Sequence, residues 1–479
     1  MAATEIERAG QFELLVAELH TSTGLVQDIT KNLINIQIWE SMDYNSLYGE
    51  ATIQSQYGLS NIGPIIGQEF LALKFRTPTI DDEKSQMDFS ENVFHVRGIA
   101  DRQSVGVSSE MINIKFVSAE LMRNLRTRVS ESLKGPISQI VGNMLSRVNC
   151  NKDKFIENTI GQIKWVAPNV TPYEVIQSLT PRAISGDASQ SQASPTFWFW
   201  ESMKGIHFRT LDSCIAQQPR WSYTTHESGS SRAKEDVFTE LSNLQGFILA
   251  ANDSMMDHAS GMMNSTLITH NTHTKSYTIK EYNYLDNFPK ETHIGYGNPL
   301  YTGTPIGLRE NGTDRFSDGQ SKIFLNTTVE DNIGNDPSHL DFAGMNSYRG
   351  KNPNGWMQRR HSQVSQIYEG INAKINVWGN SVVSSGDIIN IDVPFKSHHT
   401  LEDKKFDDFL QGEFLVRAIR HEFDFLGQNH HMEMDCVKDT LPISYEDVDY
   451  PIEPIPSIKG DTITAVSYTH LTLPTIYSV

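Results

Sequence analysis

Cysteine is scarce in this sequence of 479 residues, which contains only Cys150, Cys214 and Cys436. The number is odd, the three residues lie far apart, and no two of them form a Cys-x-x-Cys pair. These features exclude a disulfide framework and a zinc ribbon. We therefore expect buried free thiols in a reducing compartment. The first residues, MAATEIERAGQF, also lack the basic stretch and apolar core of a signal peptide.

Long apolar runs and excess positive charge are absent too. No stretch approaches the roughly 18 apolar residues of a membrane span, so we expect no membrane insertion. The chain has 40 Lys and Arg against 58 Asp and Glu, a net charge of −18. This balance excludes a general nucleic-acid binder, which needs a basic face to release phosphate counterions. It does not exclude a surface past which DNA moves without binding.

The rest of the composition is typical of a globular protein. Aromatic residues make up 9% of the chain, with 32 Gly and 19 Pro, which is too ordinary for a disordered or collagen-like protein. At about 150 residues per domain, the length predicts about three domains. The hydrophobic fraction of 38% is below the usual ~45–50%.

Catalytic and cofactor-binding motifs are missing. The sequence has no P-loop, no Gly-x-Gly-x-x-Gly after a strand, no Gly-x-Ser-x-Gly and no His-Glu-x-x-His. His421-Glu422 begins the last motif but lacks its second histidine. His421 could instead meet His430 or His431 across a turn and bind a metal, but a polar pair between strands or a solvent contact is the interpretation we favour. Residues 81–83, 398–399 and 402–405 are predicted to be solvated loops. We therefore predict no catalytic, cofactor-binding or metal-binding residue and no enzyme activity.

Residues 11–118 have the pattern of a strand-rich first domain. Ile34, Ile36 and Ile38 alternate with polar or half-polar neighbours, which is the period of a half-buried strand. Similar alternation recurs at 51–55, 71–75 and 112–116, separated by turn residues. Several short alternating strands in about 110 residues predict a barrel or sandwich.

Residues 119–235 are predicted to form a helical and mixed domain. Pro136 can begin a helix whose apolar face carries Ile137, Ile140, Val141, Met144 and Leu145. Thr171-Pro172-Tyr173-Glu174 has the form of a capping box. The run from Phe197 to Trp200, followed by Gly205 and Ile206 to Arg209, predicts a hairpin. Its aromatic side chains could stack on nucleic-acid bases, but a strand packed on both faces is favoured because no basic cluster surrounds it.

The C-terminal half returns to strands after an irregular region. Residues 265–270 and 277–284 could pair or extend a sheet, and 276–364 form an irregular insertion that ends in a helix at 356–369. Alternation resumes in 371–440, and we expect 236–275 plus 365–440 to form a second barrel. Residues 441–465 include three prolines within Asp447–Pro456 and predict an extended arm along a partner, with a disordered tail as the alternative.

The last segment, residues 466–479, reads VSYTHLTLPTIYSV. Its back-translation resembles a sequencing-library adapter, and we interpret the segment as an artefact that falls outside fold reasoning. The alternative is a genuine short strand, which the β-branched and aromatic residues would suit.

The order of these segments resembles the baseplate hub proteins of contractile-tailed bacteriophages. The similarity covers most of 11–440 and is weakest at 286–353. It rests on Ser46-Leu47-Tyr48-Gly49, on Trp165 and the Pro172 helix, on the hairpin that ends at Gly205–Arg209, and on Trp378-Gly379-Asn380, Gly386-Asp387-Ile388 and the run from Gly412 to His421.

The resemblance implies an α+β fold that is mainly β, with two tail-tube-like antiparallel β-barrels and inserted mixed α/β segments. It implies a homotrimer whose six barrels form a ring between the sixfold tail tube and the threefold central spike. The implied partners are the spike, tail-tube or tube-initiator proteins, and baseplate wedge and tape-measure proteins. DNA would pass through the lumen without specific binding. The protein would be assembled in the host cytoplasm and located in the tail baseplate of the virion.

Two other functions stay open at this point. One is a hub at the spike base of a contractile injection or type VI secretion system. The other is a baseplate-associated cell-wall-degrading enzyme, with its activity in 286–353. For the phage hub, a trimer would carry 3 × −18 = −54 charges, and a negative lumen would repel the phosphates of passing DNA.

Overall fold

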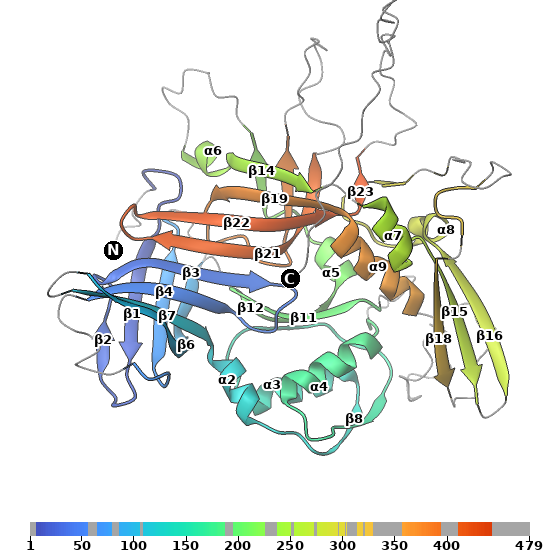
Figure 1. Ribbon diagram of the computed structural model, residues 1–479, viewed down its shortest axis with the longest axis horizontal. Helices are drawn as coiled ribbons and strands as arrows, with labels where there is room; N and C mark the ends of the chain where they lie inside the picture. The colour runs from blue at the N-terminus through green and yellow to red at the C-terminus, as the bar shows by residue number, and fades with distance from the viewer. Residues whose placement is uncertain are drawn as a thin grey trace, which may run out of the picture.

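The computed structural model describes residues 6–55, 65–78, 86–105, 109–186, 195–225, 237–250, 253–272, 275–295, 297–301, 303, 314–319, 321–328, 357–393 and 411–442. Its largest element within these residues is a sheet of 13 strands (Figure 1). The main path is β14-β19-β22-β21-β3-β4-β7-β6-β5-β1-β2, and β20 and β13 branch from β21. The strands are β1 (Glu13–His20), β2 (Val26–Asp28), β3 (Leu33–Ser41), β4 (Tyr48–Ser55), β5 (Phe70–Arg76), β6 (Met87–Ser104), β7 (Glu110–Ser118), β13 (Trp221–Thr224), β14 (Leu244–Ala250), β19 (Ile371–Trp378), β20 (Ile388–Asp392), β21 (Gly412–Asp424) and β22 (Asn429–Lys438).

Strand β21 joins the N-terminal and C-terminal strand-rich regions. Its first residues pair with β20, from Ile388↔Leu415 to Ile391↔Gly412. After a register shift between Val416 and Ala418, its second half pairs antiparallel with β3, from Ala418↔Ser41 to Asp424↔Asn35. The two regions therefore form one continuous sheet, and the predicted mainly β fold is confirmed. The division of this sheet into two barrels stays a prediction.

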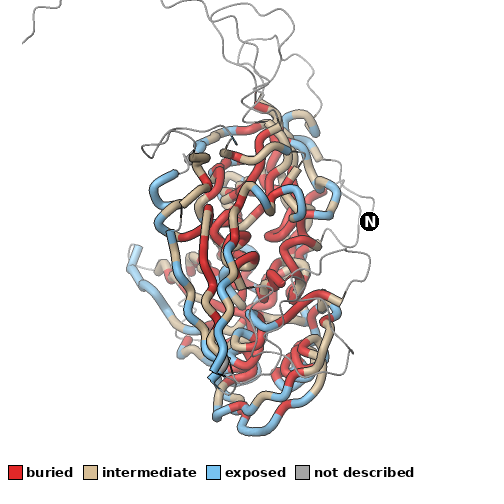
Figure 2. Tube along the Cα trace, turned by 90° about the vertical axis from the view of Figure 1, so that its right-hand side faces the viewer, coloured by how far each residue is buried: buried red, intermediate tan, exposed pale blue. Residues whose placement is uncertain are grey.

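Each region has its own hydrophobic core. The N-terminal strands enclose one cluster that includes Ile36, Phe75 and Phe116. The C-terminal strands enclose a second, with Ile375, Phe414 and Met434 among its members. A further cluster around Trp200 and Leu415 lies where the regions meet. In Figure 2 the buried segments run through the interior, and the exposed ones lie at turns and outer strands.

The helical region forms a separate layer at the bottom of Figure 1. Its core contains the five apolar residues predicted for the helix after Pro136. The predicted hairpin is present, because Phe197 pairs with Thr210 and Ser202 with Gly205. The elements are α2 (Ala119–Arg126), α3 (Ile137–Arg147), α4 (Pro172–Leu179), η2 (Thr180–Arg182), α5 (Leu211–Ile215), β8 (Ser132–Gly135), β9 (Lys154–Ile156), β10 (Ile163–Val166), β11 (Phe197–Ser202) and β12 (Gly205–Thr210).

A small three-stranded sheet projects at the lower right of Figure 1, away from the N-terminal strands at the left. Here 264–271 pairs with 276–283 and, in parallel, with 322–328. The sequence allowed 265–270 and 277–284 to pair, and they do. It also assigned 236–275 to the second barrel, but the strand at 264–271 lies in the small sheet instead. The long helix of this region begins at Met357, as the pattern at 356–369 predicted. The elements are α6 (Val237–Leu241), α7 (Ser254–Ser260), β15 (Asn264–Asn271), β16 (Ser276–Asn283), α8 (Tyr284–Asn287), η3 (Phe288–Lys290), β17 (Asn298–Pro299), β18 (Lys322–Thr328), α9 (Met357–Glu369) and β23 (Thr440–Leu441).

Several predicted features lie outside the described residues. These are the charged loops at 81–83, 398–399 and 402–405, most of the irregular region, the arm beyond residue 442, and the segment 466–479. Within the described part, every helix falls short of the length and apolarity that a bilayer crossing needs.

Helix α4 begins with the predicted capping box. The Thr171 hydroxyl oxygen accepts from the Glu174 amide at 3.3 Å, and the Glu174 carboxylate accepts from the Thr171 amide at 2.7 Å. We expect Thr171→Ala to cost about 1 kcal/mol, because one amide of the first turn loses its acceptor. Hydrogen exchange of the α4 amides would then accelerate about fivefold. Thr171→Ser keeps the acceptor and should exchange like the native chain, and equal rates for all three chains would contradict this role.

Candidate functional site

One face of the central strands is polar. In these strands buried side chains alternate with half-buried or exposed ones. Residues directly opposite each other on paired strands share a face. The register therefore aligns the half-buried and exposed side chains in rows, such as Glu433, Arg420, Trp39 and Tyr48. We name this side the polar face. It consists of Lys374 and Asn376 (β19), His431, Glu433 and Asp435 (β22), Arg420, Glu422 and Asp424 (β21), Asn35, Gln37 and Trp39 (β3), Tyr48, Glu50, Thr52 and Gln54 (β4), and Met111, Asn113 and Lys115 (β7).

The polar face carries more negative than positive charge. Its carboxylates are Glu50, Glu422, Asp424, Glu433 and Asp435, and its Lys and Arg residues are Lys115, Lys374 and Arg420. Each of these three is paired with a carboxylate: Lys115–Glu50 at 2.9 Å, Lys374–Asp435 at 3.8 Å, and Arg420–Glu422 and Arg420–Glu433 at 3.2 and 3.3 Å. Exposed pairs add little stability. They nevertheless mean that every Lys and Arg of this face already has a carboxylate partner when DNA phosphate approaches.

Glu422 lies at the centre of the polar face and accepts hydrogen bonds from two neighbours on β3. Asn35 and Gln37 donate side-chain amides to its Oε1 at 3.0 and 3.2 Å. Partial burial raises the pKa of Glu422, but these hydrogen bonds and the charge of Arg420 outweigh that effect and hold the pKa below its ordinary value. The junction between the two regions therefore presents a fixed negative charge at neutral pH.

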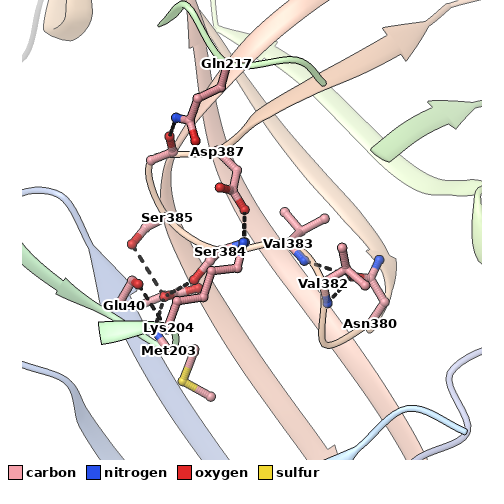
Figure 3. A network of polar contacts seen from close by, with 12 residues as sticks. Glu40, Met203, Lys204, Gln217, Asn380, Val382, Val383, Ser384, Ser385 and Asp387 are labelled. Carbon is pink, nitrogen blue, oxygen red and sulfur yellow. Dashed lines mark hydrogen bonds and ion pairs between the residues drawn. The ribbon is translucent and has the colours of Figure 1, made fainter. Parts of the chain in front are cut away.

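A buried polar cluster lies behind the polar face, around Glu40 of β3 (Figure 3). The Glu40 carboxylate accepts from the Met203 amide at 2.8 Å, the Ser384 hydroxyl at 3.0 Å and the Ser385 hydroxyl at 3.4 Å. Its other oxygen faces Nε2 of His421 at 3.2 Å. Glu40 is 1% exposed, and a buried carboxylate needs such partners to offset its lost hydration. It thereby fixes the β11–β12 turn and the loop before β20 onto the sheet.

The loop at 380–387 has further internal anchors. Asn380 Oδ1 accepts from the amides of Val382 and Val383, both at 3.1 Å. Asp387 accepts from the Ser384 amide at 3.0 Å and forms an ion pair with Lys204 at 2.5 Å (Figure 3). Burial raises the pKa of Asp387 despite the nearby Lys204 charge. These contacts hold the segment between β19 and β20 in one conformation against the hairpin.

A second buried ionic cluster connects the helical region to the first strands. Lys152 forms ion pairs with Glu201 and, at 3.0 Å, with Glu120. Glu201 also accepts from the Leu47 amide at 3.0 Å and the Ser118 hydroxyl at 2.8 Å. Burial alone would lower the pKa of Lys152, but the two carboxylates outweigh it and hold that pKa above its ordinary value.

The histidines suspected of metal binding form a buried pair instead. Nδ1 of His421 lies 3.2 Å from Nε2 of His430, and both side chains are buried. The polar-pair interpretation from the sequence is the arrangement observed. Both ring nitrogens of His421 have protein partners, since the other faces Glu40. No three His, Cys, Asp or Glu side chains in the described ranges are grouped to hold a metal ion. Burial and then the charge of His421 lower the pKa of His430 well below its ordinary value.

The other residues considered from the sequence have structural roles. Phe197, Phe199 and Trp200 are buried, which confirms the strand packed on both faces. The three cysteines are free and buried, as predicted, and burial raises the pKa of Cys214 to about 12. Glu40, Lys152 and Glu201 were not among the residues predicted from the sequence. A signal existed for two of them, because Glu40 follows Ile36 and Ile38, and Glu201 follows Phe197 and Phe199, at the spacing of the buried row.

The fold is similar to that of known tail proteins. No protein-family model matches the sequence, and no curated protein matches it. The tail protein from Neisseria meningitidis MC58 is 8% identical, with a TM-score of 0.50 over 90% of this chain and 97% of that one. The 43 kDa tail protein of prophage MuSo2 from Shewanella oneidensis is 9% identical, with a TM-score of 0.50 over 89% and 99%. The E. coli c3393 protein, a type VI secretion component, reaches 0.39 at 8% identity over 91% and 78%, too low to support an argument. The first two establish a fold found in tail proteins.

Lys152 provides a test of the ionic cluster. Lys152→Met leaves the carboxylates of Glu120 and Glu201 buried without their cation, and we expect a loss of roughly 3–5 kcal/mol of stability. Urea unfolding followed by tryptophan fluorescence measures this loss. In Lys152→Met/Glu201→Gln one of the two charges is gone, so part of the stability should return. A double variant no more stable than the single one would contradict the electrostatic explanation.

The buried histidines predict acid sensitivity. The pKa of His430 is lower in the folded than in the unfolded chain, so below about pH 6.5 the unfolded chain binds more protons and stability falls as the pH falls. His207, whose pKa burial lowers to about 3, contributes in the same direction. We expect His430→Gln to reduce the difference in unfolding free energy between pH 8 and pH 5.5. His207→Gln is the matched variant, and an undiminished difference in both would exclude these histidines as the cause.

Proposed function

We propose that this chain is a structural, non-enzymatic protein of a phage tail baseplate: the trimeric hub between the tail tube and the central spike. The observation that carries the proposal is the pairing of β21 with β3, which joins two strand-rich regions into one sheet. Two such regions per chain allow three chains to match a sixfold tube on one side and a threefold spike on the other. The likeness to two tail proteins supports a phage setting over an injection system.

The sheet edges support a ring. Within the described residues the path of the sheet ends at β14 on one side and at the short β2 on the other. Unpaired edge strands are sites of association unless they are covered. The two edges differ, so contact between them is head-to-tail, and such contacts close into a cyclic oligomer when the rotation fits. We assign the polar face to the lumen of this ring.

The lumen assignment agrees with the passage of DNA. The three Lys and Arg residues of the polar face are each paired with a carboxylate, and the face carries a surplus of negative charge. Such a surface repels phosphate and does not bind it. The partners in this proposal are the spike, tail-tube or tube-initiator proteins, and wedge and tape-measure proteins. The place of action is the baseplate of the virion, after assembly in the host cytoplasm.

The oligomeric state tests the proposal. We expect light scattering to give about three times the chain mass of 54.0 kDa and electron microscopy to show rings. Leu249 lies on β14 and is 36% exposed. Leu249→Lys should yield monomers, because a charge on an edge strand blocks edge pairing. Leu426→Lys, at a turn residue that is 79% exposed, is the matched control and should remain trimeric. A monomeric native chain that binds neither tube nor spike protein would refute the proposal.

A further inference from the structure

The small three-stranded sheet and α9 are inserted between two strands that are neighbours in the central sheet. Strand β14 ends at Ala250 and β19 begins at Ile371. The two strands pair antiparallel, with Ala250 directly opposite Asn372 (Figure 1). The chain therefore leaves the central sheet and returns to it at one place, which is how a hinged unit is connected. We name the described residues between these two strands the small-sheet unit.

A buried joint holds the small-sheet unit against the central sheet. The loop after η3 lies against the end of β22, where the Ile294 amide donates to Asp439 Oδ1 at 2.9 Å. The Thr440 hydroxyl donates to the Ile294 carbonyl oxygen, and β17 pairs with β23. Glu291 and His293 of the same loop face partners on both sides. We name Glu291, His293, Ile294, Asp439 and Thr440 the joint.

His293 of the joint lies between two groups that only accept hydrogen bonds. Its Nδ1 is 2.7 Å from the Asp439 carboxylate, and its Nε2 is 2.8 Å from the Phe288 carbonyl oxygen. Satisfying both acceptors takes a proton on each ring nitrogen, so this geometry selects the imidazolium. Burial opposes the charge, but the hydrogen bond and the charge of Asp439 outweigh it and raise the pKa of His293. Loss of one proton leaves an acceptor oxygen facing a nitrogen lone pair.

Glu291 of the joint favours its neutral form. Its side chain is 3% exposed, and the Arg359 guanidinium of α9 lies 3.9 Å away. The same guanidinium is 3.3 Å from the Asp212 carboxylate of α5, so two buried carboxylates share one cation. The Tyr282 hydroxyl of β16 also donates to Glu291, at 2.8 Å. Burial nevertheless outweighs these partners and raises the pKa of Glu291 to about 7.

We propose that the joint is a pH-sensitive switch: it holds the small-sheet unit on the central sheet while His293 is an imidazolium and Glu291 is a neutral acid, and it releases the unit when both protons are lost. With both protons in place, the two buried cations balance the carboxylates of Asp212 and Asp439. Without them, these two carboxylates and that of Glu291 share the single cation of Arg359. The buried site then carries surplus negative charge, which is costly.

The other charged and titratable groups that face Glu291 and His293 come from every element packed against the joint. They are Asp212 (α5), Tyr282 (β16), Tyr284 (α8), Arg359 (α9) and Asp439 (between β22 and β23). Burial raises the pKa of both tyrosines well above its ordinary value, so neither loses its proton near neutral pH. The pKa values of Glu291 and His293 are both higher in the closed joint than in an exposed chain. Opening therefore releases protons, and a rise in pH favours it.

Hydrogen exchange of the full chain between about pH 6 and pH 8.5 tests the switch, with each rate divided by that of an unstructured chain at the same pH. For Glu291 alone, a pKa of about 7 when closed and 4.5 when open makes opening about tenfold more favourable at the higher pH. We therefore expect the protection of 291–295 and 438–442 to fall at least about tenfold. Strands β15 and β16 of the same unit, and β3 and β4 of the central sheet, should not lose protection. The effect of His430 on the whole fold has the opposite direction.

Two variants separate the switch from a general effect of pH. Glu291→Gln is neutral at every pH, so the protection of the joint should fall less than in the native chain. His293→Gln offers one donating group for two acceptors at every pH, so the joint should already be less protected at about pH 6 and should change less. Glu281→Gln, at an exposed position of β16, is the matched control and should follow the native chain. Equal falls in the joint and the reference strands, or a native-sized fall in either joint variant, would overturn the proposal.

Discussion

The structure depends on one strand that serves two regions at once. The first residues of β21 pair with β20, and the later ones pair with β3. Its side chains enter three separate cores: Phe423 belongs to that of the N-terminal strands, Phe414 to that of the C-terminal strands, and Leu415 to the cluster between them. The register shift at Val416 is what allows the change, because a bulge bends a strand and increases its twist. A slip of one residue would exchange the core and polar faces of both regions.

The buried polar clusters lie at the same junction, on the side of the sheet opposite the polar face. Ionic groups in an interior add little net stability compared with apolar packing, because their desolvation offsets most of the attraction. What they add here is a fixed geometry. Glu40 has separate partners on the hairpin turn, on the loop before β20 and on β21, and these contacts connect the three elements to β3. Regions with separate cores are thereby held in one relative position, which the proposed ring requires.

The sequence predicted the features that depend on nearby residues. The capping box at Thr171, the apolar face after Pro136 and the hairpin at Gly205 each follow from spacing within a few positions. Strand partners are different, because they depend on surfaces far apart in the chain. The alternation at 265–270 is compatible both with the observed pairing with 276–283 and with the second barrel to which the domain boundaries assigned it. No residue near these positions in the sequence distinguishes the two arrangements. The β3–β21 pairing could not be predicted for the same reason, because its two strands lie far apart in the sequence.

The buried charged residues were only partly predictable from the sequence. Glu40 occupies the third position of a row that begins with two buried isoleucines, and His421 stands between Ile419 and Phe423 in the same phase. A charged residue in phase with a buried row signals either a broken strand or a buried polar contact, and the continuation of the row decides between them. Lys152 gave no such signal, because it lies in a loop and its partners are 32 and 49 positions away.

The effect of the net charge of −18 on DNA binding depends on where the charged side chains lie. Binding to DNA depends on cations that can displace the counterions of the phosphates, and an acidic protein can still bind through one basic patch. What prevents this on the polar face is pairing: Lys115, Lys374 and Arg420 each have a carboxylate within 4 Å. Because an engaged cation must leave its carboxylate before it binds phosphate, local pairing lowers the affinity of this face for DNA, by a small amount because exposed pairs are weak and are themselves screened by salt. For a channel in the proposed ring, this local property matters more than the total charge.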